Sequence, residues 1–164
     1  MTATLLIAYG NPSRQDDGLA YHIVLALRDL LGLELITIDE FADGELLSGL
    51  QVCYTQQLMP EMAEMLAEMD TVVFMDAHVP GTSYQPVHWE EIQPMFLPSM
   101  VSHHFKPKVL IAWCTSLYGR APKAFVLSVL GTDFDFGTEL SSETAKRVNE
   151  AAHLLADRLG LLPT

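Results

Sequence analysis

Basic residues are scarce in this sequence of 164 residues. Lysine and arginine together number 9, against 21 aspartates and glutamates, which gives a formal net charge of −12 at pH 7. A nucleic-acid-binding surface needs a stripe of basic side chains for the phosphates, and an anionic membrane attracts the same kind of charge. We therefore expect neither nucleic acid nor a membrane as partner, and we interpret most of the acidic residues as solvated surface.

Cysteines and long apolar runs are also in short supply. The two cysteines, Cys53 and Cys114, lie far apart inside apolar segments and form no Cys-x-x-Cys pair, which excludes a zinc ribbon and a thiol redox motif. No apolar run reaches the roughly 18 residues that a membrane-spanning helix requires. The first residues lack the basic segment of a secretory signal. We expect a cytoplasmic protein, with a monomer as the simplest state.

Apolar residues are plentiful, at 49% of the chain, and their spacing predicts a fold. Helical spacing over residues 17–31, 60–69, 107–118 and 141–159 separates short apolar runs. Buried strands are predicted at 5–9, 50–55, 71–75 and 124–130, with a weaker strand at 87–92 and a brief one at 35–38. The alternation predicts an α/β fold over residues 1–164: one three-layer domain, with a mainly parallel, twisted sheet of about five strands sandwiched between helices.

The loop at residues 10–18 follows the first predicted strand. It lacks the Gly-x-Gly-x-x-Gly pattern of a dinucleotide-binding loop. It carries two adjacent acids, Asp16 and Asp17, which would repel a pyrophosphate. Such acids also suit a helix start, where Asp16 would cap the helix over 17–31 and Asp17 would lie in its first turn.

Asp76 and the pair His103 and His104 complete a set of candidate site residues. Asp76 directly follows the apolar strand at 71–75, and parallel strands carry their ligands at their carboxyl ends. Two aspartates and one histidine from separate loops suit Ni²⁺ or Zn²⁺ and leave a coordination position open. A nucleophilic triad is less favoured, because Cys114 lies within a predicted helix and no Gly-x-Ser-x-Gly elbow is present. His78, two residues after Asp76, is a candidate for supporting it.

Four blocks of the sequence, in order, resemble the hydrogenase maturation endopeptidases, which process the large subunit of nickel–iron hydrogenases. The first block holds Gly10 and Asn11 followed by Asp16, Asp17 and Gly18, and it is similar to the opening motif of that family. The others are residues 57–61 leading to 72–77, residues 102–104 followed by 117–122, and residues 136–141.

The resemblance implies a twisted sheet between helices, a peptidase activity and a set of metal-binding residues. By motif position the metal ligands are Asp17, Asp76 and His103, with Asp16 and His104 as the alternates in the doubled acid and the doubled histidine. It implies that the protein removes a C-terminal extension from a nickel–iron hydrogenase large-subunit precursor after nickel insertion. The nickel, held by cysteines of the precursor, would complete its coordination with these residues; zinc or cadmium would be able to occupy the same site in a crystal.

Two questions stay open at the level of the sequence. The scissile carbonyl is attacked either by metal-activated water with Asp16 as general base or by water that the carboxylates activate alone. We therefore include Asp16 with Asp17, Asp76 and His103 in the predicted catalytic set. The alternative function is a non-catalytic, nickel-sensing chaperone that binds the precursor without cutting it.

Overall fold

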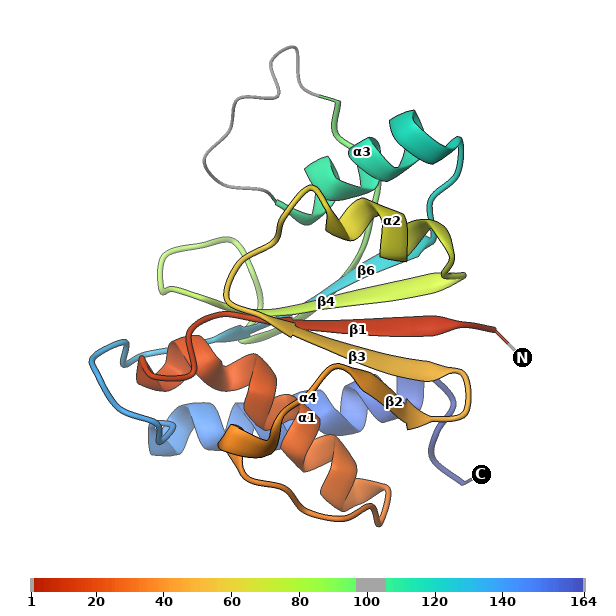
Figure 1. The fold of residues 1–164 in the computed structure, drawn as a ribbon. Helices are drawn as coiled ribbons and strands as arrows, with labels where there is room; N and C mark the ends of the chain where they lie inside the picture. Colours follow the sequence, from red (N-terminus) through yellow and green to blue (C-terminus); the bar gives the residue numbers. More distant parts are fainter. Residues whose placement is uncertain (1, 97–105, 164) are drawn as a thin grey trace.

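A computed structural model describes residues 2–96 and 106–163, which form one six-stranded sheet with helices on both faces (Figure 1). The strand order is β2-β3-β1-β4-β6-β5. The four inner strands are parallel, and each outer strand is antiparallel to its neighbour. The strands are β1 (Thr4–Tyr9), β2 (Gly44–Leu47), β3 (Leu50–Thr55), β4 (Thr71–His78), β5 (Val87–Ile92) and β6 (Lys123–Leu130).

The apolar core lies in two layers, one on each face of the sheet. Leu6 and Ala8 of β1 pack with the first and last helices, whereas Leu5 and Ile7 pack with the two middle helices. Strand residues alternate between faces, so a strand covered on both sides has to be apolar throughout. The helices are α1 (Leu19–Leu30), α2 (Met62–Ala67), α3 (Pro107–Tyr118) and α4 (Ser142–Arg158). This arrangement confirms the predicted mainly parallel sheet between helices.

One prediction within the sheet was wrong. Residues 35–38 form no strand: Leu35 is 64% exposed, and Ile38–Glu40 form a short 3₁₀ turn. The additional strand, β2, lies further along the chain and makes a hairpin with β3. An outer strand has only one neighbour and tolerates charged residues such as Glu45, so the acidic composition of this segment concealed it.

The chain leaves the neighbouring strands β1 and β4 toward opposite edges of the sheet. β1 leads through α1 to β2 and β3 on one side of it, whereas β4 leads to β5 at the other edge. Neighbouring parallel strands whose connections diverge in this way leave a crevice at their carboxyl ends. Tyr9 ends β1 and Asp76 lies near the end of β4, so both belong to this crevice. Among the described helices, none has the length and apolarity needed to cross a membrane.

Candidate functional site

The loop after β1 folds back tightly on itself. Gly10 has a φ of +137°, and a Cβ there would lie 2.1 Å from the carbonyl oxygen of Asp17. A Cβ on Gly18 would lie 2.6 Å from the Cα of Pro12. The backbone N–H of Asn11 donates to Oδ2 of Asp17 over 2.8 Å. The two glycines therefore allow a close approach that holds the half-buried Asp17 carboxylate at the carboxyl edge of the sheet.

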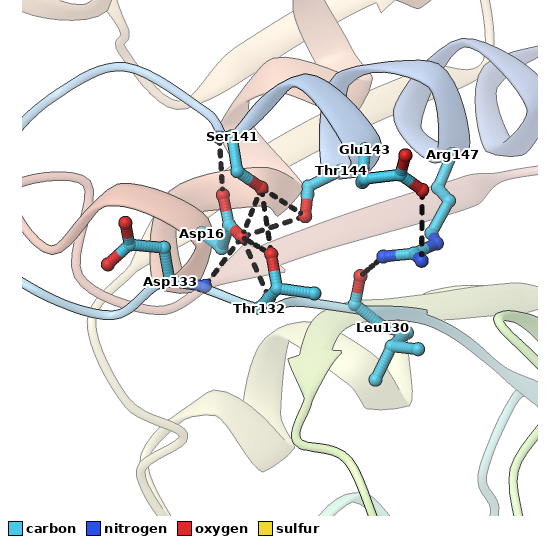
Figure 2. A network of polar contacts seen from close by, with 8 residues as sticks. All are labelled: Asp16, Leu130, Thr132, Asp133, Ser141, Glu143, Thr144 and Arg147. Carbon is cyan, nitrogen blue, oxygen red and sulfur yellow. Dashed lines mark hydrogen bonds and ion pairs between the residues drawn. The ribbon is translucent and has the colours of Figure 1, made fainter.

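Asp16, the neighbouring acid, is fully buried and saturated with hydrogen bonds (Figure 2). Its Oδ1 accepts from the backbone N–H of Ser141 at 2.9 Å. Its Oδ2 accepts from the backbone N–H groups of Thr132 at 2.8 Å and Asp133 at 3.0 Å. The hydroxyls of Ser141 and Thr144 donate to the same oxygen at 2.8 and 2.7 Å. The carboxylate thus joins the loop after β1, the loop after β6 and the start of α4.

The ionisation of Asp16 follows from these donors. Burial alone would raise the pKa of Asp16, but the N–H groups of Thr132, Ser141 and Asp133 and the hydroxyl of Thr144 outweigh it and hold the pKa well below its ordinary value. A carboxylate that stays ionised and enclosed is poorly suited to accept a proton from water. The geometry therefore favours a structural role for Asp16 over that of a general base.

The predicted cap on the helix over 17–31 was wrong, because Asp16 serves a different helix. α1 begins at Leu19 after Gly18, with no side-chain cap, and Asp16 lies in a preceding 3₁₀ turn. Ser141 is the N-cap of α4. In many helices the backbone N–H of the N-cap residue donates a hydrogen bond to the side chain of a glutamate or glutamine three residues later. That position holds Thr144, so Asp16 supplies the missing acceptor from the other end of the chain.

Residues 132–141 also contact the loop after β1 through backbone hydrogen bonds. The N–H of Gln15 donates to the carbonyl of Gly137 at 2.8 Å, and the N–H of Gly137 donates to the carbonyl of Ser13 at 2.9 Å. The Nε of Arg14 donates to the carbonyl of Phe134 at 3.2 Å. The first and fourth sequence blocks, far apart in the chain, therefore form one structural unit that supports Asp17.

The environment of Asp76 is the opposite of that of Asp16, because few hydrogen-bond donors surround it. Tyr9, on the neighbouring strand, donates its hydroxyl to Oδ2 of Asp76 over 2.8 Å. Oδ1 of Asp76 is buried without a hydrogen-bond partner among the described residues. Burial raises the pKa of Asp76 and the charge on Asp17 adds to the effect, while the hydroxyls of Ser128 and Tyr9 oppose it. A buried carboxylate oxygen with no donor is a favourable place for a cation or a proton.

Asp17 and Asp76 lie at the carboxyl ends of the neighbouring strands β1 and β4: Gly10, which follows Tyr9, approaches Asp17, and the hydroxyl of Tyr9 donates to Asp76. The charge of Asp17 adds to the upward shift in the pKa of Asp76. Within residues 2–96 and 106–163, no three histidine, cysteine, aspartate or glutamate side chains cluster as metal ligands. His103 and its alternate His104 lie outside the described residues, so the predicted third ligand stays a prediction. The two aspartates supply oxygen donors that fit a divalent cation, and Oδ1 of Asp76 is free to bind one.

His78 contacts Ser128 and has no hydrogen bond to Asp76. Its Nδ1 lies 2.9 Å from the Ser128 hydroxyl, and the ring of Tyr84 packs edge-on against the imidazole with a centroid separation of 5.4 Å. Burial lowers the pKa of His78, and the charges of His88 and Arg147 lower it further. Any support that it gives to Asp76 therefore passes through Ser128, which faces both residues.

Tyr9 and Ser128 did not emerge from the sequence as site residues. Tyr9 reads as the end of an apolar run, and only the parallel register of β1 and β4, with Ala8 opposite Met75, places it beside Asp76. Ser128 lies opposite Asp76 in the register of β4 and β6. The pairing of neighbouring strands is therefore the information that would have identified Tyr9 and Ser128 as site residues. Cys114 is buried, and its thiol donates to the carbonyl oxygens of Ala63 and Arg120, which confirms its predicted place in the core.

Comparison with known proteins identifies the fold. No protein-family model and no curated protein sequence matches the chain significantly. Among solved structures, the NiFe hydrogenase maturation protease HycI from Thermococcus kodakarensis matches at a TM-score of 0.61 and 21% identity, over 97% of this chain and 93% of that one. The hydrogenase maturating endopeptidase HybD from E. coli matches at a TM-score of 0.66 and 15% identity, over 96% and 91%.

A third structure extends the same likeness. The hydrogenase 2 maturation peptidase from a Thaumarchaeota archaeon matches at a TM-score of 0.62 and 19% identity, over 97% of this chain and 99% of that one. The chain therefore has the fold of the hydrogenase maturation proteases over nearly its whole length. This confirms the fold that the resemblance of the sequence blocks implied.

Proposed function

We propose that this chain is an endopeptidase that removes the C-terminal extension of a nickel–iron hydrogenase large-subunit precursor after nickel insertion. The observation that carries the proposal is Oδ1 of Asp76, a buried carboxylate oxygen that has no donor within the described part of the chain, on the strand next to the one whose following loop holds Asp17. Its setting in a fold shared with hydrogenase maturation proteases supports the choice of substrate.

Recognition of the precursor operates through its nickel in this proposal. Asp17 and Asp76 offer carboxylate oxygens to the metal, and His103 is the proposed third donor. The hydrogen bond from Tyr9 occupies Oδ2 of Asp76 and leaves Oδ1 for the ion. Zinc or cadmium would fit the same donors. Docking through the metal would prevent cleavage of the precursor before nickel is inserted, because only the nickel-loaded precursor carries the metal.

Cleavage then follows from positioning. The docked precursor presents its scissile peptide bond near the crevice, and the oxygen of a water molecule adds to the carbonyl carbon. The bond between carbon and nitrogen breaks, and the leaving nitrogen takes up a proton. Asp17 and Asp76 are the proposed groups that handle the protons, because Asp16 is enclosed by its hydrogen bonds.

Mass spectrometry of the precursor tests the proposal directly. The precursor from the same organism, with and without nickel, is incubated with wild-type protein and with the Asp17→Asn and Asp76→Asn variants. Glu150→Gln, an exposed carboxylate on α4, is the matched control. We expect shortening of the nickel-loaded precursor by the wild type and the control only.

The possible outcomes separate the proposed peptidase from its alternative. An intact precursor that nevertheless binds the wild-type protein would overturn the peptidase and favour the nickel-sensing chaperone. Undiminished cleavage by both aspartate variants would overturn the assignment of the site. A His103→Ala variant, assayed in the same way, tests the proposed third donor.

A further inference from the structure

A pocket of about 450 Å³ extends from Asp76 toward α3. Its walls come from the end of β5, from β6 and from the first turn of α3, which covers this part of the sheet (Figure 1). Backbone contact ties the two sides together, since the N–H of Met95 donates to the carbonyl of Lys108 at 3.0 Å. The lining residues are Tyr9, Asp76, Tyr84, Ile92, Met95, Lys106, Pro107, Lys108 and Val126. Its volume lies in the range of ligand-binding sites in proteins.

The lining joins three kinds of chemistry in one pocket. Asp76 and Tyr9 contribute the polar pair of the crevice, and Oδ1 of Asp76 has no hydrogen-bond partner in residues 2–96 and 106–163. Apolar side chains such as Ile92 and Val126 form walls that favour an apolar group on the ligand. Lys106 and Lys108 add two of the 9 basic residues of the chain.

The two lysines are available to a ligand. Lys106 is exposed and Lys108 is half-buried, and neither forms an ion pair with another described residue. Both lie at the start of α3, where the helix dipole adds a partial positive charge. In a chain with a net charge of −12, this local concentration of positive charge favours an anionic group.

The carboxylate of Asp76 makes the pocket more favourable for an anion with a single charge than for one with a higher charge. A phosphate carries a charge of about −1.5 to −2 at neutral pH, which the carboxylate in the same pocket would repel. A single carboxylate beside an apolar side chain satisfies the lysines and the apolar walls together. Lysine also binds as a point charge and imposes no planar, bidentate geometry, so it accepts carboxylates in varied positions along a peptide.

We propose that this pocket is a substrate subsite for a peptide segment that carries an apolar side chain next to a carboxylate. The inference rests on the proposed function, in which the segment is the part of the C-terminal extension that directly follows the scissile bond. Asp76 belongs both to the metal crevice and to the pocket. A chain held through its metal at Asp17 and Asp76 therefore continues past Asp76 toward the lysines.

Peptide binding, measured by fluorescence anisotropy without nickel or cleavage, tests the pocket by itself. The probes are two labelled, amidated pentapeptides with leucine at the second position and either glutamate or lysine at the third. We expect the wild type to bind the glutamate peptide about three- to tenfold more tightly, with the difference shrinking as salt is added. The doubly substituted variant Lys106→Glu, Lys108→Glu should reverse the preference.

The controls separate charge recognition from loss of folding. Lys146→Glu changes an exposed lysine on α4 and should keep the wild-type preference. Acidic residues are favourable at a helix start, so the double variant should melt close to the wild-type temperature. If the double variant prefers the lysine peptide, its pocket is folded, because an unfolded chain would bind neither peptide selectively.

The inference would be overturned if the wild type bound both peptides equally or not at all, or if the double variant kept the preference for glutamate. With the nickel-loaded precursor, the double variant should raise KM with little change in kcat. Precursor cleavage with an unchanged KM would overturn the subsite while leaving the proposed function standing. If the wild type did not cleave the nickel-loaded precursor but the double variant reversed the peptide preference, the proposed function would be overturned and the charge-selective pocket would be established.

Discussion

Asp16, which is fully buried, and Asp76, which is half-buried, are two carboxylates near the same edge of the sheet, and their surroundings differ in almost every respect. Backbone N–H groups and hydroxyls surround Asp16, and they lower its pKa. The hydroxyl of Tyr9 donates to Oδ2 of Asp76, Oδ1 has no hydrogen-bond partner among the described residues, and burial raises the pKa of this carboxyl group. A fully satisfied carboxylate stabilises the fold, whereas an under-satisfied one retains capacity to bind a ligand.

The comparison predicts first that Asp16 is the more important of the two for stability. Asp16→Ala leaves several buried donors without an acceptor, and we expect a loss of about 4 kcal/mol in the free energy of unfolding. Urea denaturation followed by circular dichroism measures the change, with Glu150→Gln as the control that stays near the wild type. A loss below about 1 kcal/mol would contradict the structural role given to Asp16.

Asp76 should show the reverse pattern, with activity affected and stability retained. Asp76→Asn removes a charge that burial disfavours, so we expect unfolding free energy to be unchanged or raised by about 1 kcal/mol. Cleavage of the nickel-loaded precursor should fall by about 100-fold, because a carboxylate donor to the metal is lost. Initial rates by mass spectrometry and a urea titration of the same preparation provide both values. A strongly destabilised but active variant would reverse the comparison.

Tyr9 sharpens the contrast because its hydroxyl donates to Oδ2 of Asp76. Tyr9→Phe removes the hydroxyl and preserves the ring, and we expect precursor cleavage to fall by about tenfold. The thermal midpoint should drop by only a few degrees, since a single hydrogen bond is worth about 1 kcal/mol. Tyr118→Phe, an exposed tyrosine at the end of α3, is the matched control. Equal cleavage by the two variants would show that the hydroxyl of Tyr9 does not position Asp76.

The pH dependence of stability should have opposite signs for the two acids. The pKa of Asp16 is lowered in the folded state, so its stabilisation is present above the unfolded value of about 3.9 and is lost as pH falls below it. The pKa of Asp76 is raised, so its ionisation in the folded state is disfavoured and the wild type loses stability relative to Asp76→Asn as pH rises above about 3.9.

Urea titrations of wild type, Asp16→Asn and Asp76→Asn between about pH 3 and pH 7 measure this difference. The wild type should have a higher free energy of unfolding than Asp16→Asn at neutral pH, and this advantage should shrink toward acid pH. It should have a lower free energy of unfolding than Asp76→Asn at neutral pH, and this deficit should also shrink toward acid pH. Differences of the same sign for both variants would remove the distinction between the two environments.

The fold was largely predictable because the inner strands are covered on both faces. Leu5 to Ala8 and Val72 to Met75 are apolar at every position, and such runs identify buried strands without knowledge of their partners. β2 escaped prediction because an outer strand is less constrained, and Glu45 is tolerated there. Asp17 and Asp76 were recognisable as candidate ligands because Asp17 lies in the loop after β1 and Asp76 follows an apolar run that ends near the carboxyl end of β4.

Local sequence patterns were enough to place the helices, the inner strands, the excess of acid and the candidate aspartates. Which of the two adjacent acids supports the fold depends on contacts between segments that are distant in the chain. One of the three backbone N–H groups that donate to Asp16 belongs to Ser141, 125 positions further along the chain, and no local pattern reports such a bond. The place of Tyr9 beside Asp76 likewise depends on the register of β1 with β4. Hydrogen-bond satisfaction is a property of the surroundings, and the surroundings of both aspartates exist only once the sheet has formed.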